Sequence, residues 1–248
     1  MAIILYELCA GDDRIRFSPH CWKARMALAH KGLDYETRPT PFTAVPVIND
    51  GFSKTVPVID DGGRLVRESF DIAVYLENAY PDRPSLFRGE GGRAHAKFVE
   101  SWALTEVHPL LLTLIILDIY GRLAPVDQAY FRRSREERFS RQLEEVQAGR
   151  EHRVDAFREK LAPVRLMLKR QPFLGGDGPL FADYILFGPL QWARVASPFP
   201  VLSADDPVSA WFGRCLDLHH GMARQMPAAI LMWRHFADDA RRNDIEAP

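Results

Sequence analysis

The sequence has few cysteines, almost no net charge and no long hydrophobic run, and each of these shortages excludes a class of protein. Only three cysteines occur in 248 residues, Cys9, Cys21 and Cys215, with neither a disulfide framework nor the paired spacing of a zinc site. The 32 basic and 33 acidic side chains leave a net charge of −1, so no overall field attracts nucleic acid or a membrane surface. We therefore expect no metal, no nucleic-acid partner and only local thiol chemistry.

No segment resembles a membrane span or a secretion signal. The longest apolar run, residues 110–117, is far shorter than the about 20 residues needed to cross a bilayer. The first six residues lack the basic region and long apolar core of a signal peptide and are typical of a strand. With 47% apolar residues the chain can bury a substantial core, and we expect a cytoplasmic protein with no membrane contact.

The first 80 residues alternate strand and helix patterns. Apolar and β-branched side chains fill Ile3–Leu8, and apolar residues recur at helical spacing from Pro19 until Lys31 and Gly32 end the pattern. The segments that follow are a strand at Asp34–Arg38, an irregular proline-containing stretch, a hairpin at Val56–Ile59 and Arg64–Arg67, and a helix capped by Ser69 that runs to Tyr80. The order βαβ–ββα predicts a thioredoxin-like α/β domain over residues 1–80.

A polar stretch rich in proline and glycine at residues 81–92 is typical of a linker between domains. Strand patterns vanish beyond it, so residues 93–248 are predicted to form an all-α domain. Helical spacing marks Arg93–Leu123, Ser134–Arg170, Asp183–Val195, Pro207–Arg224 and Ala228–Arg241. The pair His219-His220 beside Gly221 is predicted to be a helix end with favourable cations, and not a ligand pair.

The turn from Phe17 to Lys23 brings together a helix start, a hydroxyl and a thiol. Ser18 followed by Pro19 is a strong start signal, because the serine oxygen caps a free N–H and proline at the first helical position loses no hydrogen bond. Aligned peptide dipoles and free N–H groups stabilise an anion there by roughly 0.3–1 kcal/mol, and by more where water is excluded. This turn is therefore a candidate thiolate site.

Three motifs and the two-domain plan resemble the cytosolic glutathione S-transferase family over the whole chain. The motifs are Ser18-Pro19-His20-Cys21, Lys54-Thr55-Val56-Pro57-Val58 and Glu68-Ser69. Within the family, residues 17–23 and 206–218 look most like the serine-type bacterial β-etherases and the fungal etherase-related transferases. The resemblance implies glutathione as co-substrate, a homodimer and a role in detoxification.

The resemblance also implies where glutathione would lie. A cis bond between Val56 and Pro57 would expose the N–H and C=O of Val56 to the cysteinyl backbone of the peptide. Glu68 would bind the γ-glutamyl ammonium, while Ser69 and the helix N–H groups would bind its α-carboxylate. Lys54 is a candidate for the glycyl carboxylate, and a solvated loop charge is the alternative interpretation.

By the same resemblance Ser18 is the catalytic residue, whose hydroxyl would donate a hydrogen bond to the glutathione sulfur. Lowering the thiol pKa from near 8.5 by about two units needs roughly 2.7 kcal/mol, which one charge-assisted hydrogen bond and the helix end can supply. A plain N-cap is also a sufficient role for Ser18. The two roles are compatible, because a hydroxyl has two acceptor lone pairs and one donor proton.

Cys21 occupies the place of the second cysteine in a redox Cys-x-x-Cys motif, but the first cysteine is missing, which excludes a dithiol cycle. A mixed disulfide between Cys21 and glutathione stays open beside inert packing, the commoner role of a lone cysteine that faces a helix interior. Cys9 and Cys215 are interpreted as core residues for the same reason.

The acceptor pocket of this family lies between the first domain and the early helices of the second. The resemblance places Trp102, His108, Leu111, Leu112, Ile115 and Tyr120 there, although most of these also suit a helix core. An aromatic lining favours a large, flat, apolar acceptor. His20 is expected to touch a substrate more readily than His108, with a solvated surface histidine as the alternative.

One departure from the family pattern concerns helix capping. The family usually has Ser or Thr three residues before the aspartate of an internal helix, whereas Leu180 precedes Asp183 here. Asp183 can still accept from the Leu180 N–H, so we expect the helix to form with a start weaker by about 1 kcal/mol.

These observations lead to one expected function and two rivals. We expect a glutathione-dependent transferase or lyase that directs the thiol at a hydrophobic, aromatic acceptor, either by conjugation or by cleavage of a β-aryl ether. The first rival is a non-catalytic glutathione-binding or scaffolding protein of the same fold. The second is a thiol–disulfide enzyme that uses Cys21.

Overall fold

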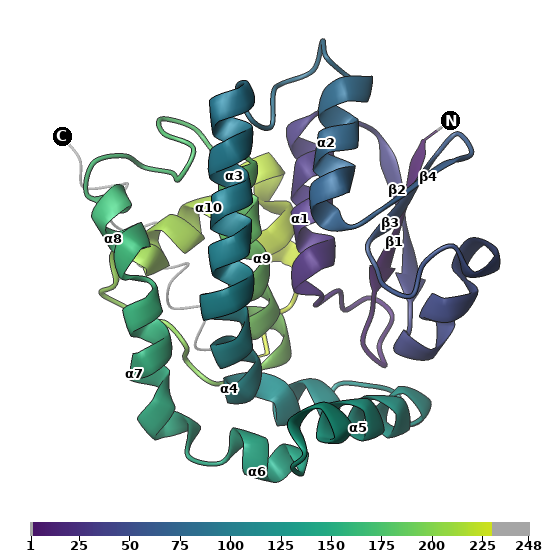
Figure 1. Cartoon of the computed structure of the whole chain (residues 1–248), viewed down its shortest axis with the longest axis vertical. Coiled ribbons are helices and arrows are strands. Elements are labelled where there is room, and N and C mark those ends of the chain that lie inside the picture. The colour runs from purple at the N-terminus through teal and green to yellow at the C-terminus, as the bar shows by residue number, and fades with distance from the viewer. Residues whose placement is uncertain (1, 230–248) are drawn as a thin grey trace.

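The computed structural model describes residues 2–229, which form a mixed α/β half followed by an all-helical half (Figure 1). The strands and helices of the first half are β1 Ile3–Leu8, α1 Pro19–His30, β2 Tyr35–Thr40, β3 Val58–Asp61, β4 Arg64–Arg67 and α2 Ser69–Ala79. Their order confirms the predicted βαβ–ββα plan and the thioredoxin-like α/β fold class.

The four strands pair in the order β2-β1-β3-β4. β1 and β2 run parallel, as the α1 crossover requires, while β3 is antiparallel to both β1 and β4. Leu5 and Ile59 lie opposite each other in this register and are both fully buried. The alternating apolar side chains of the strands therefore form the face on which α1 and α2 pack (Figure 1).

The segment between β2 and β3 is more ordered than its prolines predict. Residues Phe42–Gly51 form a 3-10 helical stretch that contains Pro46, and it bends where Asn49 and Asp50 adopt positive φ angles of 45° and 56°. Proline is compatible with such short helical turns because its fixed φ suits them and its missing N–H has no strand partner to lose. The expected irregular connection is thus a defined structural element that carries Phe42.

Up to residue 229, where the described chain ends, the helices of the second half are joined by loops and no strand occurs, as predicted. Their bounds are α3 Glu90–Trp102, a π-helical turn Ala103–Val107, α4 His108–Tyr120, α5 Pro125–Phe139, α6 Leu143–Gln147, α7 Arg150–Lys160, α8 Ala162–Leu168, α9 Phe181–Ala196 and α10 Pro207–Gln225. The predicted continuous pattern over Ser134–Arg170 is wrong, because the chain turns at Ser140 and Gly149, whose φ angles are 51° and 67°. The predicted helix Ala228–Arg241 lies almost wholly outside the described residues.

The continuous helical stretch Glu90–Tyr120 is long and apolar enough, by length and composition, to cross a membrane. The apolar run at residues 110–117, considered by itself, is too short to do so. In the structure, 44% of the most apolar window of the long stretch is buried inside the protein, and α3 and α4 both pack against α9. A central helix of a globular domain passes the same composition test.

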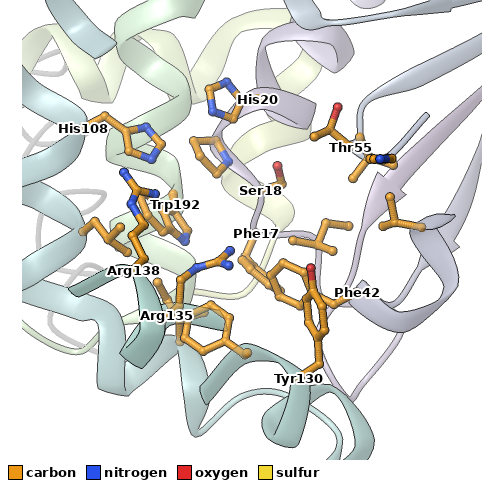
Figure 2. Close-up of a pocket in the computed structure, with 18 of the residues that line it drawn as sticks. Phe17, Ser18, His20, Phe42, Thr55, His108, Tyr130, Arg135, Arg138 and Trp192 are labelled. Carbon is orange, nitrogen blue, oxygen red and sulfur yellow. The ribbon is translucent and has the colours of Figure 1, made fainter. Parts of the chain in front are cut away.

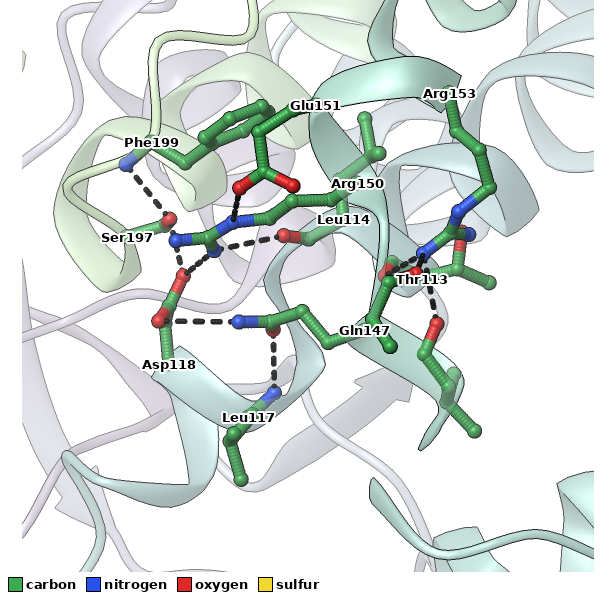
Figure 3. Close-up of polar contacts among 12 residues, drawn as sticks. Thr113, Leu114, Leu117, Asp118, Gln147, Arg150, Glu151, Arg153, Ser197 and Phe199 are labelled. Atoms are coloured by element: carbon green, nitrogen blue, oxygen red, sulfur yellow. Dashed lines mark hydrogen bonds and ion pairs between the residues drawn. The ribbon is translucent and has the colours of Figure 1, made fainter. Parts of the chain in front are cut away.

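A polar network joins α4 to the helices that follow it (Figure 3). Asp118 accepts hydrogen bonds from Arg150 at 2.5 Å, Ser197 at 2.5 Å and Gln147 at 3.3 Å. The Arg150 guanidinium also lies 4.4 Å from the Phe199 ring centroid, which holds its plane. This network therefore fixes α4 to α6, to α7 and to the end of α9.

The two halves meet mainly where α1 packs on α9. The Trp22 and Phe187 rings lie edge to face at 6.3 Å, and both side chains are fully buried. Gly188 lets the two backbones approach, because a Cβ atom there would lie 2.2 Å from the Pro19 carbonyl oxygen. The position of the first turn of α1 is thus set by a helix far along the chain.

α9 begins at a carboxylate that four donors surround. Asp183 accepts from the backbone N–H groups of Leu174 at 2.7 Å, Gly175 at 2.9 Å and Leu180 at 3.0 Å, and from the Trp211 indole at 2.9 Å. The expected bond back to Leu180 is confirmed, and the Asp183 N–H, which a cap hydroxyl would accept from, donates to the Leu180 carbonyl oxygen at 2.9 Å.

Candidate functional site

Ser18 caps α1, as its sequence predicts. Its hydroxyl oxygen accepts a hydrogen bond from the Cys21 N–H at 3.3 Å, and Pro19 occupies the first helical position. The Ser18 side chain is 4% exposed and lines a cavity between the two halves of the described chain. The serine proton is not needed for capping, so it remains able to donate to a ligand.

Buried contacts hold the chain that leads into Ser18. Glu7 on β1 is 1% exposed and pairs with Arg16 at 3.1 Å and Arg25 at 3.0 Å. The Trp22 indole donates to the Arg16 carbonyl oxygen at 3.0 Å. Together with the close approach of Gly188, these contacts fix the turn from three sides. Such fixation is what a preorganised hydrogen-bond donor requires.

The cavity has a volume of about 430 Å³ and lies against the start of α1 (Figure 2). The α/β half contributes Ser18, His20, Phe42 and the loop before β3, and the helical half contributes α4, α5 and α9. Its lining residues are Leu8, Phe17, Ser18, Pro19, His20, Phe42, Val45, Pro46, Lys54, Thr55, Val56, His108, Leu112, Ile119, Tyr130, Phe131, Arg135, Arg138 and Trp192. This volume suits a small organic molecule.

The loop before β3 forms one wall of this cavity. Lys54 is exposed, Val56 is half-buried, and both line the cavity with Thr55. The Val56–Pro57 peptide bond is cis, as the family resemblance implies. Within residues 2–229, neither the N–H nor the C=O of Val56 has a hydrogen-bond partner. Both groups are therefore free to pair with an extended peptide.

Glu68 and Ser69 lie at the start of α2, but their roles differ from the prediction. The cap is Glu68, with a φ of 64°, and Ser69 is the first helical residue, so the assignment of Ser69 as cap is wrong. Glu68 accepts from the Thr55 hydroxyl at 3.0 Å, which links this helix start to the loop before β3. Neither residue lines the cavity itself.

The three cysteines are all free and buried. The Cys21 sulfur accepts from the Leu8 N–H at 3.5 Å, and burial raises the pKa of this thiol to about 12. Burial also raises the pKa of Cys9, to about 11, and that of Cys215 well above its ordinary value. A thiol with so little thiolate at neutral pH is a poor nucleophile, so Cys21 behaves as a packing residue.

Two histidines stack beside Ser18. The His20 and His108 rings are nearly parallel with centroids 5.3 Å apart, and His108 also lies 4.9 Å from the Trp192 ring. Burial lowers the pKa of His20 well below its ordinary value and that of His108 to about 4. Both rings are therefore neutral at physiological pH and present an aromatic surface to the cavity.

The helical wall of the cavity differs from the set that the resemblance placed there. His108 and Leu112 line it, whereas Leu111 and Ile115 are fully buried core, and Trp102 and Tyr120 are absent from the lining. The residues that sequence reasoning missed lie on α5 and α9: Tyr130, Phe131, Arg135, Arg138 and Trp192. The sequence signal for them is the aromatic-and-arginine spacing of residues 130–138.

The His219-His220 pair is not a cationic helix end. Both residues have positive φ angles, 52° and 61°, within a bend of α10. His219 Nε2 bonds to the Tyr184 hydroxyl at 3.0 Å, and that hydroxyl lies 2.7 Å from His30 Nδ1. Burial lowers the pKa of His219 to about 4, so its ring is neutral.

Among residues 2–229, no group of three metal-ligating side chains converges on a point.

Comparisons with known proteins agree with this architecture. The family model for the glutathione S-transferase N-terminal domain matches residues 14–84, and the model for its C-terminal domain matches residues 94–215. Glutathione S-transferase Z1 of Arabidopsis thaliana is 36% identical over 111 residues, which are 40% of this chain and 50% of that protein. The match thus spans about half of that curated relative.

Solved structures match over nearly the whole chain. Glutathione transferase GSTFuA3 from Phanerochaete chrysosporium is 29% identical, with a TM-score of 0.71 and coverage of 96% of both chains. The transferase CsGST63524 of Ceriporiopsis subvermispora, solved in complex with glutathione, shares the fold at 24% identity and a TM-score of 0.75, over 92% of this chain and all of that one. Glutathione is the co-substrate of this family. With both halves matched by its domain models, the chain belongs to the glutathione S-transferase family.

Proposed function

We propose that this protein is a glutathione-dependent transferase in which the Ser18 hydroxyl donates a hydrogen bond to the glutathione sulfur. The observation that carries the proposal is the position of Ser18: it caps α1, its proton is not used by the cap, and it faces the cavity between the two halves. One hydrogen bond to an anion contributes about 1.5–3 kcal/mol, and the helix end adds to it. Together these match the roughly 2.7 kcal/mol that two units of thiol pKa need.

Glutathione would lie along the wall made by the loop before β3 and the start of α2. The free N–H and C=O of Val56 would pair with the cysteinyl backbone, while Pro57 holds the turn. Glu68 would bind the γ-glutamyl ammonium, and Ser69 with the first N–H groups of α2 would bind its carboxylate. Lys54, exposed on the cavity wall, would bind the glycyl carboxylate. The contact between Thr55 and Glu68 keeps these two elements in register.

The reaction needs only a polarised thiolate and a positioned acceptor. The sulfur attacks an electrophilic carbon, a C–S bond forms, and the leaving group departs with its electron pair. For an aryl ether beside a carbonyl, the leaving group is an aryloxide, which then takes a proton from solvent. The aromatic lining from Phe17, Phe42, Tyr130 and Trp192 supports a flat, apolar acceptor and the etherase-like branch of the serine-type enzymes.

Binding and turnover experiments test this proposal separately. Calorimetry should show glutathione binding that weakens about tenfold or more in Glu68→Gln, because that variant loses a charge-assisted contact. Glu36→Gln on β2, an exposed position away from the cavity, should bind like the parent protein. Turnover is measured with aryl halides and with aryloxy ketones. Binding without any turnover would favour the rival, a non-catalytic glutathione-binding protein.

We further propose that the chain acts as a cytoplasmic homodimer. Phe98 on α3 supports dimer formation, because its ring is 71% exposed and apolar side chains of that size are normally covered. Light scattering should give the mass of two chains for the parent protein. Phe98→Ser should shift the mass toward one chain, while Val126→Ser, at another exposed apolar position, should not.

A further inference from the structure

The charge on the cavity lining is one-sided. Three cations line it, Lys54, Arg135 and Arg138, and none of the lining residues is an aspartate or glutamate. The two histidines on the wall, His20 and His108, have lowered pKa values because they are buried, so they add no charge that an anion could use at neutral pH. Among residues 2–229, the lining therefore offers the two arginines no counter-charge.

The two cavity-lining arginines of α5, Arg135 and Arg138, differ from Arg132 on the same helix. Arg132 pairs with Glu136 at 2.7 Å and with Glu144 at 2.8 Å. Arg135 and Arg138 pair with no carboxylate anywhere in residues 2–229. Residues 132–138 of α5 contain four arginines: Arg132 has carboxylate partners, Arg133 is exposed to solvent outside the cavity, and the two that line the cavity have no carboxylate partner in the described chain.

Arg135 is held in place although it lacks an ion pair. Its guanidinium lies 4.8 Å from the Phe131 ring centroid and 5.8 Å from that of Phe42, and it donates to the Ser134 hydroxyl at 2.9 Å. Burial and the nearby Arg138 lower the pKa of Arg135. Stacking leaves the edge of a guanidinium, with its fork of donors, free to meet an anion.

These arginines lie on the acceptor side of the cavity. In Figure 2, Ser18 stands between Thr55, on the wall assigned to glutathione, and the side chains of Arg135 and Arg138, which enter from α5. Tyr130 and Phe42 stand beside Arg135, and His108 and Trp192 stand beside Arg138. A flat ring among these aromatic residues would place a substituent against the guanidinium groups.

We propose that Arg135 and Arg138 select acceptors that carry a carboxylate, so that the substrate class is aromatic acids and not neutral aromatics. The proposal rests on the proposed function, because it assigns the acceptor to the same cavity. Arg135 provides the oriented fork, and Arg138, at the exposed rim, attracts the anion and completes its coordination. A carboxylate in this position relieves the repulsion between the two cations.

A matched pair of product analogues tests the proposal without turnover. S-(para-carboxybenzyl)glutathione and S-benzylglutathione share the peptide and the ring and differ only in the carboxylate. We expect calorimetry to show that the parent protein binds the carboxylated analogue at least tenfold more tightly, since one hydrogen-bonded ion pair is worth that much or more. The preference should shrink as salt is raised.

Single and double variants test whether the two arginines cause the preference for the carboxylated analogue. Arg135→Gln and Arg138→Gln should each reduce the preference for the carboxylated analogue severalfold, and the double variant should abolish it while the affinity for S-benzylglutathione stays within about twofold. Arg135→Lys should show part of the preference that Arg135→Gln loses, because lysine keeps the positive charge but lacks the forked pair of guanidinium donors. Arg133→Gln, an exposed position of the same helix that does not line the cavity, should keep the full preference.

The outcomes separate the two proposals. If neither analogue binds, the glutathione site itself is wrong, and the acceptor assignment falls with it. If both bind with equal affinity, or if the preference survives the double variant, the proposed function stands and the carboxylate selection is overturned. A rise in the pKa of the bound glutathione thiol in Arg135→Gln, with the preference intact, would also overturn it, because Arg135 would then act on the sulfur.

Discussion

The two walls of the cavity are built in different ways. The α/β wall consists of short contiguous pieces, the start of α1, the stretch Phe42–Gly51 and the loop before β3, and the start of α2 adjoins that loop through the bond between Thr55 and Glu68. The helical wall consists of single side chains from three separate helices, with His108 on α4, Arg135 on α5 and Trp192 on α9. One wall is a property of local sequence, and the other is a property of tertiary packing.

This difference predicts that the two walls respond differently to substitution. A peptide bound through backbone groups tolerates changes elsewhere in the chain, because those groups are present whatever the side chains are. An acceptor bound by side chains depends on how α5 and α9 pack. Substitutions in the scaffold, at the junction of the two walls and at single side chains test this contrast.

The largest effect is expected at Asp183, which holds the start of α9. Asp183→Ala leaves three backbone N–H groups and the Trp211 indole without an acceptor in a fully buried site. We expect a loss of about 4 kcal/mol or more in the free energy of unfolding, measured by urea denaturation. Asp155→Ala, on an exposed side chain, should change it by less than about 0.5 kcal/mol. A loss of less than 1 kcal/mol in Asp183→Ala would contradict this account of the α9 cap.

Gly188 tests whether the helical half positions the α/β wall. In Gly188→Ala the new Cβ would meet the Pro19 carbonyl oxygen at 2.2 Å, so α9 and the first turn of α1 must move apart. We expect destabilisation of about 1–3 kcal/mol and weaker glutathione binding. Gly213→Ala on α10 is the matched control, because a Cβ there has open space, and it should be neutral or stabilising. Unchanged glutathione affinity in Gly188→Ala would show that the α/β wall is independent of α9.

Acidification tests the neutral histidines of the helical half. Burial lowers the pKa values of His108 and His219 to about 4, whereas both titrate near 6.5 in the unfolded chain. The unfolded state therefore binds more protons between these values, and stability falls as pH drops from about 6.5 to about 4. We expect a loss of several kcal/mol over this range by thermal unfolding, with about 3 kcal/mol from each ring. His219→Gln should show a shallower pH dependence, and an unchanged slope would mean that this ring is not a neutral buried group.

The smallest effect is expected at Cys21. Burial raises the pKa of this thiol to about 12, so it contributes no nucleophile at neutral pH. Cys21→Ala should cost about 1 kcal/mol of stability, through a small cavity and the lost contact with Leu8, and should leave glutathione conjugation within twofold. Loss of thiol–disulfide exchange activity in this variant would instead revive the redox interpretation.

The sequence was most informative where structure is local. Ser18-Pro19 predicted both the start and the cap of α1, and the β-branched run at Ile3–Leu8 predicted β1 to the residue. The Ser69 assignment was wrong by one position, because Glu68 takes a positive φ that no sequence pattern signals at a glutamate. Capping rules identify helix starts to within a residue or two, since neighbouring polar residues compete for the same role.

The acceptor wall could not be predicted in the same way. Arg135 and Arg138 share a charge-dense stretch with Arg132, and only the fold shows that Glu136 and Glu144 serve Arg132 alone. The breaks at Ser140 and Gly149 divide that stretch into α5, α6 and α7, which run in different directions (Figure 1). Which face of a charged helix meets a cavity depends on its neighbours, and these come from distant parts of the chain.

The central claim is that the Ser18 hydroxyl lowers the pKa of the bound glutathione thiol, and its titration is the direct measurement. The ultraviolet absorbance of the thiolate, followed against pH, should give a pKa about two units below the free value in the parent protein and in Ser18→Thr. Ser18→Ala and Ser18→Gly should both return it toward 8.5, although glycine keeps most of the capping preference. A lowered pKa that persists in both hydroxyl-free variants would contradict the account.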